Sequence, residues 1–210
     1  MSEVRHAVLQ FRPEKSRLRE SLARLRAHLE ALRPHAPQVV VLPEAALTGY
    51  FLQGGVRELA LTRHELLELL VGVYEKVGWE GVLDVVVGFY ERDEGAYYNS
   101  AAYLELPHRV VHVHRKVFLP TYGVFDEERY FTAGHASCIV EIKGVACGIA
   151  ICADLWEVGA AEAARKAGAH VLLTLNASPF HLGKHARRYE VLRQRIAAIG
   201  CPVVYANLVG

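Results

Sequence analysis

Residues 137–175, SCIVEIKGVACGIAICADLWEVGAAEAARKAGAHVLLTL, decide the fold class. The apolar segments 137–142 and 145–151 flank a Lys-Gly turn, which predicts a β-hairpin. The segment 157–167 predicts a helix, and the apolar run 171–175 predicts another strand. A hairpin is antiparallel, whereas a helical crossover joins parallel strands. The stretch therefore predicts an α/β domain built on mixed sheets.

The same alternation of strands and helices continues outward in both directions. Residues 15–33 place leucines at three- and four-residue steps, which is typical of an amphipathic helix. Pro34 and Pro37 end that helix. Further predicted strands are 5–11, 38–42, 82–90, 99–106, 109–114 and 203–206, with 99–106 and 109–114 forming a second hairpin, and further predicted helices are 60–77 and 185–199. No repeat or linker divides the chain, so we expect one domain over residues 1–210.

Composition excludes several classes of protein. The chain has 210 residues, 52% hydrophobic and 22% charged, and a net charge of +1. A chain this apolar buries enough surface to offset its ordering entropy, which excludes intrinsic disorder. The balanced charge argues against a nucleic-acid-binding protein, and no apolar run approaches the roughly 18–20 residues of a membrane span. Residues 1–12 lack a signal-peptide layout, so we expect a cytoplasmic location.

The four cysteines fall into two groups. Cys138, Cys147 and Cys201 lie in apolar surroundings, where thiols usually pack in a core. No CxxC pair is present, which gives no support to a zinc ribbon or a thioredoxin-like site, and we expect reduced thiols. Cys152 differs because it follows a strand and precedes a helix, where a helix N-terminus and a nearby cation lower the pKa of a thiol.

Three reactive residues, Glu44, Lys116 and Cys152, each lie at the carboxyl end of a predicted strand. Ligands bind at these ends in open α/β sheets. Taken singly, each residue also fits a solvated loop or a packed thiol. Together they predict acyl transfer, with Cys152 as nucleophile and Glu44 as base and acid. Lys116 and the N–H of Ala153 would then stabilise the oxyanion.

Four segments around these residues resemble a known family. They are LPEAALTGY (42–50), HRKVFLPTYGVFDEERYFTAG (114–134), GIAICADLW (148–156) and LLTLNASPF (172–180). The chain resembles the nitrilase, or carbon–nitrogen hydrolase, superfamily. Within it, YGVFDEERYF, NASPF and CPVVYANLVG are most similar to the glutaminase domain of glutamine-dependent NAD synthetases.

The resemblance implies a nitrilase-like αββα sandwich and the cleavage of amide or nitrile C–N bonds by a Glu–Lys–Cys triad, without a metal or organic cofactor. It implies that Glu127 lies beside the triad and holds the lysine or the substrate. It also implies that Tyr122 belongs to the substrate pocket, that Ser178 lies in a loop contacting the glutamine backbone, and that Trp156 lines the pocket. A homo-oligomer and an NAD synthetase that accepts ammonia are the implied partners.

The chain departs from the family pattern at two points. The similar glutaminases usually carry a glutamate directly after the nucleophile, where it receives the substrate's α-ammonium group, whereas this chain has Ala153. The chain also ends soon after its last predicted strand, so we expect C-terminal truncation of the domain. We expect no ATP-binding synthetase domain within these residues, since Gly54-Gly55 lacks the spacing and the lysine of a phosphate loop.

Two further groups of residues have alternative interpretations. His112 and His114 alternate on one strand near His108, as metal ligands do, but no third ligand is apparent, so packed or solvated histidines are the alternative. Arg187, Arg188, Arg193 and Arg195 predict a solvated helix face, with a salt bridge to a substrate carboxylate as the alternative.

The sequence therefore leaves three functions open. The first is a cysteine-dependent amide hydrolase acting on glutamine. The second is a freestanding amidase for a small carboxamide without an α-ammonium group, which Ala153 would suit. The third is a non-catalytic subunit that keeps the fold.

Overall fold

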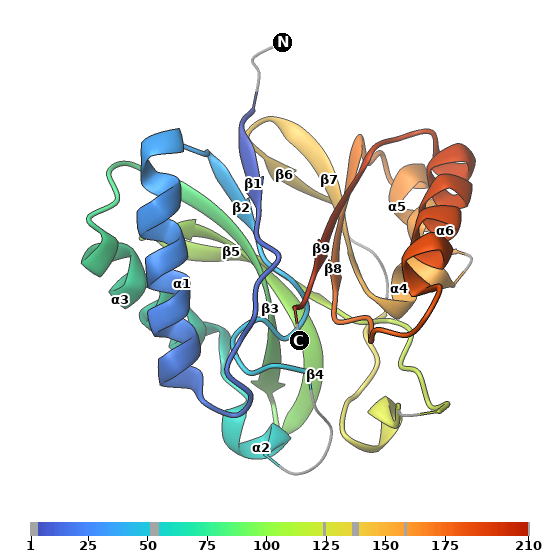
Figure 1. Ribbon diagram of the computed structural model, residues 1–210, viewed down its shortest axis with the longest axis horizontal. Coiled ribbons are helices and arrows are strands. Elements are labelled where there is room, and N and C mark those ends of the chain that lie inside the picture. Colours follow the sequence, from blue (N-terminus) through green and yellow to red (C-terminus); the bar gives the residue numbers. More distant parts are fainter. Residues whose placement is uncertain (1–3, 51–54, 124, 136–138, 158, 210) are drawn as a thin grey trace.

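The computed structural model describes residues 4–50, 55–123, 125–135, 139–157 and 159–209, which form two facing β-sheets between layers of helices (Figure 1). Its elements in chain order are β1 (His6–Val8), α1 (Leu18–Leu32), β2 (Val39–Val41), α2 (Val56–Leu59), α3 (Arg63–Val77), β3 (Leu83–Asp93), β4 (Ala96–Leu106), β5 (Arg109–Arg115), β6 (Ile139–Ile142), β7 (Val145–Ile151), α4 (Ala153–Trp156), α5 (Ala160–Lys166), β8 (Val171–Asn176), α6 (Lys184–Ile199) and β9 (Val203–Asn207). Short 3₁₀ turns lie at Arg33–His35 and Glu127–Arg129.

Both sheets are mixed, as the sequence predicts. The first sheet has the order β1-β2-β3-β4-β5, with β1, β2 and β3 parallel and β4 antiparallel to both β3 and β5. The second has the order β6-β7-β8-β9, in which only the β6–β7 pair is antiparallel. Strands β2 and β5 therefore run in the same direction and end at one edge of their sheet, while β7 and β8 end together in the other.

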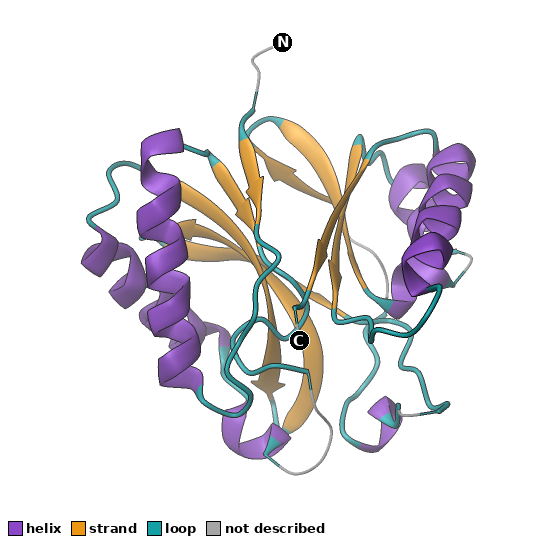
Figure 2. Ribbon diagram, in the orientation of Figure 1, coloured by secondary structure: helices purple, strands orange, loops and turns teal. Residues whose placement is uncertain are grey.

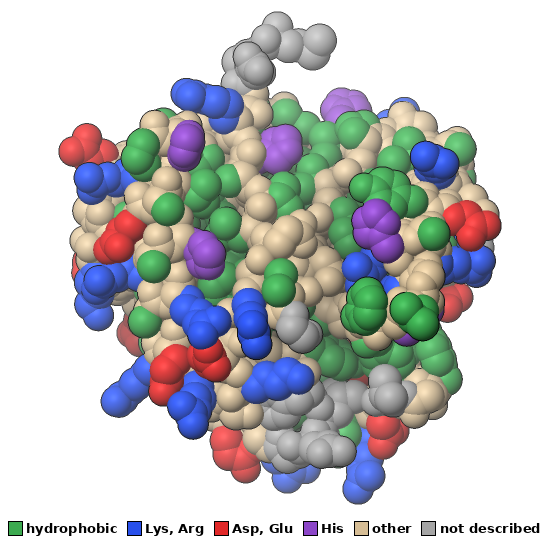
Figure 3. All heavy atoms as spheres, viewed as in Figure 1, with side chains coloured by type: hydrophobic (Ala, Val, Ile, Leu, Met, Phe, Trp, Pro, Cys, Tyr) green, Lys and Arg blue, Asp and Glu red, His purple; other side chains and the backbone are tan. Residues whose placement is uncertain are grey.

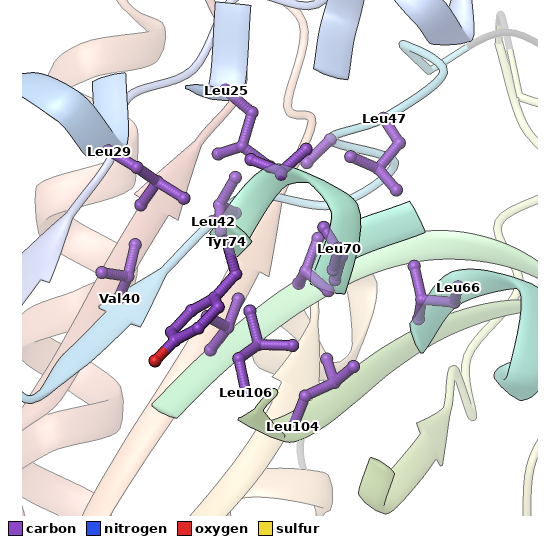
Figure 4. Packing of buried hydrophobic residues seen from close by; sticks show 14 of the residues in the cluster. Leu25, Leu29, Val40, Leu42, Leu47, Leu66, Leu70, Tyr74, Leu104 and Leu106 are labelled. Atoms are coloured by element: carbon purple, nitrogen blue, oxygen red, sulfur yellow. The ribbon is translucent and has the colours of Figure 1, made fainter. Parts of the chain in front are cut away.

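The layers form an αββα sandwich, which confirms the expected fold (Figure 2). Helices α1 and α3 cover the outer face of the first sheet, where Leu25 and Leu29 of α1 pack with Leu66 and Leu70 of α3 (Figure 4). Helices α4, α5 and α6 cover the outer face of the second sheet. Burial of a leucine side chain contributes about 1.5–3 kcal/mol, so these two layers hold the helices on the sheets.

The facing surfaces of the two sheets form a separate apolar core. Val86 and Tyr103 of the first sheet belong to the same buried cluster as Ile149 and Leu173 of the second. This core holds the two sheets together, and with them the strand ends that carry the reactive residues.

The structure corrects several predicted element boundaries. The helix predicted over 157–167 is the shorter α5, because Gly159 adopts a φ of 123° directly before it. The sequence did not predict α4, which ends where the backbone becomes extended at Glu157. The helix predicted from residue 60 begins at Arg63, since Thr62 and Glu65 form a capping box there. Strands β3 and β4 form a long hairpin around Glu94-Gly95 that the sequence did not predict.

One predicted segment lies partly outside the described residues. The first two residues of the segment 137–142, including Cys138, are not described, and β6 covers its remaining residues. Among the residues that are described, no helix is long and apolar enough to cross a lipid bilayer.

Candidate active site

Lys116 lies between two buried carboxylates. Its Nζ is 2.8 Å from Oε1 of Glu44 and 2.6 Å from Oε1 of Glu127. All three side chains are at most 1% exposed. Lys116 directly follows β5, where its N–H donates to the carbonyl of Asn99. Charges this deeply buried need partners, and the two carboxylates supply them for one ammonium.

Further hydrogen bonds hold the carboxylate of Glu44. The side-chain amide of Asn99 donates to Oε1 at 2.8 Å, and the N–H of Ala177 donates to Oε2 at 2.7 Å. The loop carrying Glu44 crosses β3 at Gly88, where an added Cβ would lie 2.5 Å from the carbonyl oxygen of Pro43. Only glycine permits that approach, and the Glu44 loop is thereby seated against the first sheet.

Cys152 occupies a strained turn between β7 and α4. Its φ of 44° and ψ of −94° lie outside the regions that a residue with a Cβ usually adopts. Its N–H donates to the carbonyl of Leu175 at 2.9 Å, which ties the turn to β8. Backbone strain of this kind persists only where surrounding structure enforces it, and it is common at functional sites.

The thiol of Cys152 lies within electrostatic reach of the buried charges. Burial and the carboxylate of Glu44 raise the pKa of Cys152, while the ammonium of Lys116 and a hydrogen bond from the Ala177 N–H lower it. The net direction is upward, so the resting thiol keeps its proton at neutral pH. Formation of the thiolate therefore requires a base, and Glu44 is the charged residue with the largest effect on the pKa of this thiol.

The neighbouring ionisable groups are also perturbed. Burial disfavours the charged form of Lys116, but Glu44 and Glu127 more than offset it and raise its pKa. Burial raises the pKa of Glu127 despite the opposing effect of Lys116. Burial and these two carboxylates raise the pKa of Tyr50, whose hydroxyl donates to Oε1 of Glu127 at 2.6 Å. At neutral pH the cluster thus holds an ammonium and neutral hydroxyl and thiol groups.

The other predicted site residues differ in their exposure and in their distance along the chain from Cys152. Ala153 is the first residue of α4, next to the thiol, and Ser178 is buried in the loop after β8. The ammonium nitrogen of Lys184 lies over the ring of Trp156, 4.4 Å from the ring centroid. Tyr122 is 66% exposed and packs edge-on against Phe125, so no described contact joins it to the thiol.

Several residues near the thiol were missed by sequence reasoning. Tyr50 ends the motif LPEAALTGY and Asn99 lies within β4, yet neither position alone indicates a partner far away in the chain. Lys184 lies at the start of α6, where burial lowers its pKa and the Cys152 charge raises it. Arg188, by contrast, is one of the arginines for which the sequence left a substrate-binding role open. It donates to the carbonyl of Ser178 at 2.6 Å, and its buried Nε has no partner among the described residues.

A cavity of about 450 Å³ opens beside the buried cluster. Its lining includes Tyr50 and Ala177, the groups that contact Glu127 and Glu44, and the basic residues Arg12 and Lys15. Figure 3 shows Lys and Arg side chains gathered on this face of the molecule, where the N-terminal end of α1 lies. Tyr50 and Ala177 thus separate this cavity from the two buried carboxylates.

The two strand histidines have separate environments. His114 is buried, and its Nε2 lies 3.3 Å from Oδ2 of Asp154. His112 is partly buried, and burial with His114 lowers its pKa. Within the described part of the chain, no three or more His, Cys, Asp or Glu residues form a group able to hold a metal ion.

The arginines of α6 also have distinct partners. Arg195 donates to the carbonyls of Leu155 and Trp156, which fastens α6 to α4. Arg187 is exposed and pairs with Glu190 at 3.2 Å. Arg188 instead contacts the loop of Ser178 and has a buried Nε without a partner among the described residues, which keeps the interpretation as a substrate-binding arginine open for that residue.

Comparison with known proteins gives a consistent picture. The chain is 34% identical over 214 residues to a glutamine-dependent NAD(+) synthetase of Xylella fastidiosa, covering all of this chain and 38% of that protein. The structure of such a synthetase from Acinetobacter baumannii superposes with a TM-score of 0.85 at 27% identity, over 99% of this chain and 38% of that one. The chain thus spans a little over a third of the length of these relatives.

Shorter proteins share the fold as well. A carbon-nitrogen hydrolase from Helicobacter pylori G27 gives a TM-score of 0.83 at 26% identity, over 99% of this chain and 74% of that one. An amidase from Nesterenkonia sp. gives a TM-score of 0.83 at 18% identity, over 99% of this chain and 76% of that one. The sequence profile of the carbon-nitrogen hydrolase family matches residues 5–210. The chain belongs to the carbon-nitrogen hydrolase family.

Proposed function

We propose that this protein is a cysteine-dependent amide hydrolase that releases ammonia through a thioester. The observation that carries the proposal is the buried Glu44–Lys116–Glu127 cluster beside the strained Cys152. It combines a nucleophile, a base and a fixed positive charge at one site, as acyl transfer requires.

The first half of the reaction forms the thioester. Glu44 takes the proton of the Cys152 thiol as the sulfur attacks the amide carbon. The ammonium of Lys116 and the N–H of Ala153 stabilise the negative charge on the carbonyl oxygen, and each such donor is typically worth about 3–4 kcal/mol. Glu44 then gives the proton to the departing nitrogen, so that the C–N bond breaks and ammonia leaves.

The second half restores the enzyme. A water molecule loses a proton to Glu44 and attacks the thioester carbon, with the same groups stabilising the oxyanion. The C–S bond breaks, the carboxylic acid leaves, and the thiol regains its proton. Glu127 keeps Lys116 charged and in place throughout. The sum is amide plus water giving acid plus ammonia.

Two substrate classes are distinguished by residues around the thiol. Glutamine is favoured by the similarity to glutamine-dependent NAD synthetases. This protein would then release ammonia, and a partner or a further domain would use it to synthesise NAD. A carboxamide without an α-ammonium group is favoured by Ala153, which supplies no charge for that group. Lys184 and Arg188 suit either class, because both are cations that can pair with a substrate carboxylate.

Ammonia release from a panel of amides tests the proposal. The panel contains glutamine, asparagine, the monoamide of glutaric acid, which is glutamine without its amino group, and propionamide. Cys152→Ala removes the nucleophile, and Cys201→Ala is the matched control because Cys201 is a buried thiol in a different cluster.

Each outcome has a distinct meaning. Release that Cys152→Ala abolishes and Cys201→Ala leaves intact supports the hydrolase. Preference for glutamine supports the glutaminase, and preference for the glutaric monoamide supports the freestanding amidase. No release from any amide by the folded protein contradicts both and favours the non-catalytic subunit.

A further inference from the structure

The carboxylate of Asp154 has four polar partners, and the proposed mechanism gives this residue no role. Its side chain is completely buried, two residues after the thiol. Oδ1 accepts from the N–H groups of Val117 at 3.0 Å and Phe118 at 2.9 Å. Oδ2 accepts from the N–H of Ile151 at 3.0 Å and lies 3.3 Å from Nε2 of His114.

These partners bracket both reactive residues in the chain. His114 precedes Lys116 by two residues, and Val117 and Phe118 follow it directly. Ile151 directly precedes Cys152, and Asp154 itself lies just beyond it. One carboxylate thus joins the segment on either side of the lysine to the turn that carries the thiol.

The bonded elements belong to different sheets. Lys116 follows β5 of the first sheet and Cys152 follows β7 of the second. The backbone after β5 is irregular, so no strand partner supplies acceptors for the N–H groups of Val117 and Phe118. Both N–H groups are partly shielded from water, so they need acceptors, and the carboxylate provides a charged one.

We propose that Asp154 is a positioning residue that fixes Lys116 relative to Cys152 across the two sheets. It touches neither substrate nor thiol in this role. It acts by holding the ammonium of Lys116 where it faces the sulfur and the developing oxyanion. The proposal rests on the proposed function only for its kinetic consequence, because the placement of Lys116 beside the thiol is measurable without any substrate.

The test uses Asp154→Asn. Asparagine has nearly the same shape as aspartate, but an NH₂ donor replaces one of the two oxygens that accept hydrogen bonds from backbone N–H groups. Asp84→Asn is the matched control, because Asp84 is equally buried and accepts from Tyr103 at 3.0 Å, with Lys143 also at 3.0 Å. The readout is the rate of Cys152 alkylation by iodoacetamide as a function of pH, measured by mass spectrometry at a temperature at which circular dichroism shows each variant folded.

The direction of the shift is diagnostic. Lys116 lowers the pKa of Cys152, so displacement of its ammonium moves the alkylation profile to higher pH. Loss of a nearby negative charge alone would move it to lower pH. We expect a shift to higher pH in Asp154→Asn and no shift in Asp84→Asn. An unchanged profile, or a shift to lower pH, overturns the proposal even if the melting temperature falls.

A kinetic measurement gives a further readout. If an amide substrate is found, Asp154→Asn should lower kcat by about 100-fold, the effect of misplacing a reactive group by roughly 1 Å, with little change in KM. Absence of activity in the wild-type protein would contradict the proposed function, while the alkylation profile would still decide the role of Asp154.

Hydrogen exchange of the wild-type protein covers the case in which Asp154→Asn does not fold. The amides of Val117 and Phe118 should then exchange as slowly as those of β5, although they lie in irregular backbone. Exchange at the rate of an open loop would overturn the proposal.

Discussion

Nζ of Lys116 lies 2.8 Å from Oε1 of Glu44, and both side chains are almost completely buried. The ammonium and the carboxylate act in opposite directions on the pKa of the adjacent Cys152 thiol. In the proposed mechanism, Glu44 keeps the thiol protonated in the resting enzyme, whereas the ammonium of Lys116 opposes that effect and stabilises the oxyanion.

Opposite substitutions in this pair should shift the reactivity of Cys152 in opposite directions. Glu44→Gln removes the negative charge, lowers the pKa of Cys152 and moves its alkylation profile to lower pH. Lys116→Gln moves the profile to higher pH. Both variants should lose ammonia release by at least about 100-fold, since each removes a group that acts in the transition state.

Cys147 serves as the internal control in the same mass spectra. Burial raises the pKa of Cys147 to about 11, and its profile should not respond to either substitution. Equal shifts of both thiols, or a shift of Cys152 to higher pH in Glu44→Gln, would contradict the electrostatic account.

Gly88→Ala should displace Glu44 without changing its side chain. The added methyl group would lie 2.5 Å from the carbonyl oxygen of Pro43 and 2.6 Å from Cα of Glu44, so the loop must move. We expect kcat to fall by about 10–100-fold. Gly72→Ala in α3 is the control, because no atom lies within 4 Å of its added methyl group. Alanine there should stabilise the helix by up to about 1 kcal/mol, and full activity of Gly88→Ala would refute the seating role.

Tyr50→Phe should weaken the support of Glu127. Loss of the 2.6 Å hydrogen bond raises the pKa of Glu127 further, since that bond favours the charged carboxylate. We expect a loss of activity of about 10-fold with a melting temperature close to that of Tyr103→Phe. Tyr103→Phe is the matched control, because Tyr103 also donates a hydrogen bond to a buried carboxylate, that of Asp84, at 3.0 Å. Equal activity of the two variants would contradict this role of Tyr50.

Glu127 should make stability depend on pH with a defined sign. Its folded pKa is raised above the ordinary 4.5 by burial, against the opposing effect of Lys116. The folded state therefore binds this proton more tightly than the unfolded state. Its contribution to stability is fully present below pH 4.5 and declines as pH rises through the folded pKa.

Urea unfolding of the wild-type protein and Glu127→Gln across this range measures the effect. Because glutamine does not titrate, the unfolding free energy of the wild type minus that of the variant should decrease from pH 4.5 toward neutrality. A difference that stays constant or increases would show that the folded pKa is not raised.

Lys184→Met should impair recognition of anionic amides selectively. The ammonium of Lys184 lies over Trp156 and within electrostatic reach of Cys152. We expect KM for the glutaric monoamide to rise by about 10-fold or more, and KM for uncharged propionamide to stay the same. Arg187→Met, which removes an exposed cation of the same helix, is the control. Equal losses for both amides would contradict a role in charge recognition.

Local sequence patterns determined much of this protein. The leucines of α1, the apolar runs of β2, β7 and β8, and the Lys-Gly turn before β7 carry their own periodicity or turn chemistry, which does not depend on distant residues. They also placed Glu44, Lys116 and Cys152 at strand ends. Ends of parallel strands meet at one edge of a sheet, so this much of the candidate site followed from pattern.

Tertiary structure decided the rest. The bond from Asn99 to Glu44 depends on how the Glu44 loop crosses the first sheet, and the bonds of Ala177 to Glu44 and of Asp154 to the Lys116 segment depend on how the two sheets face each other. Tyr122 lies in a matching motif, yet its side chain is exposed. The short helix α4, which the sequence did not predict, and the positive φ of Cys152 likewise depend on packing around the turn. A residue type and its neighbours set local conformation, whereas the partner of a buried charge is set by which distant segment the packed core brings to it.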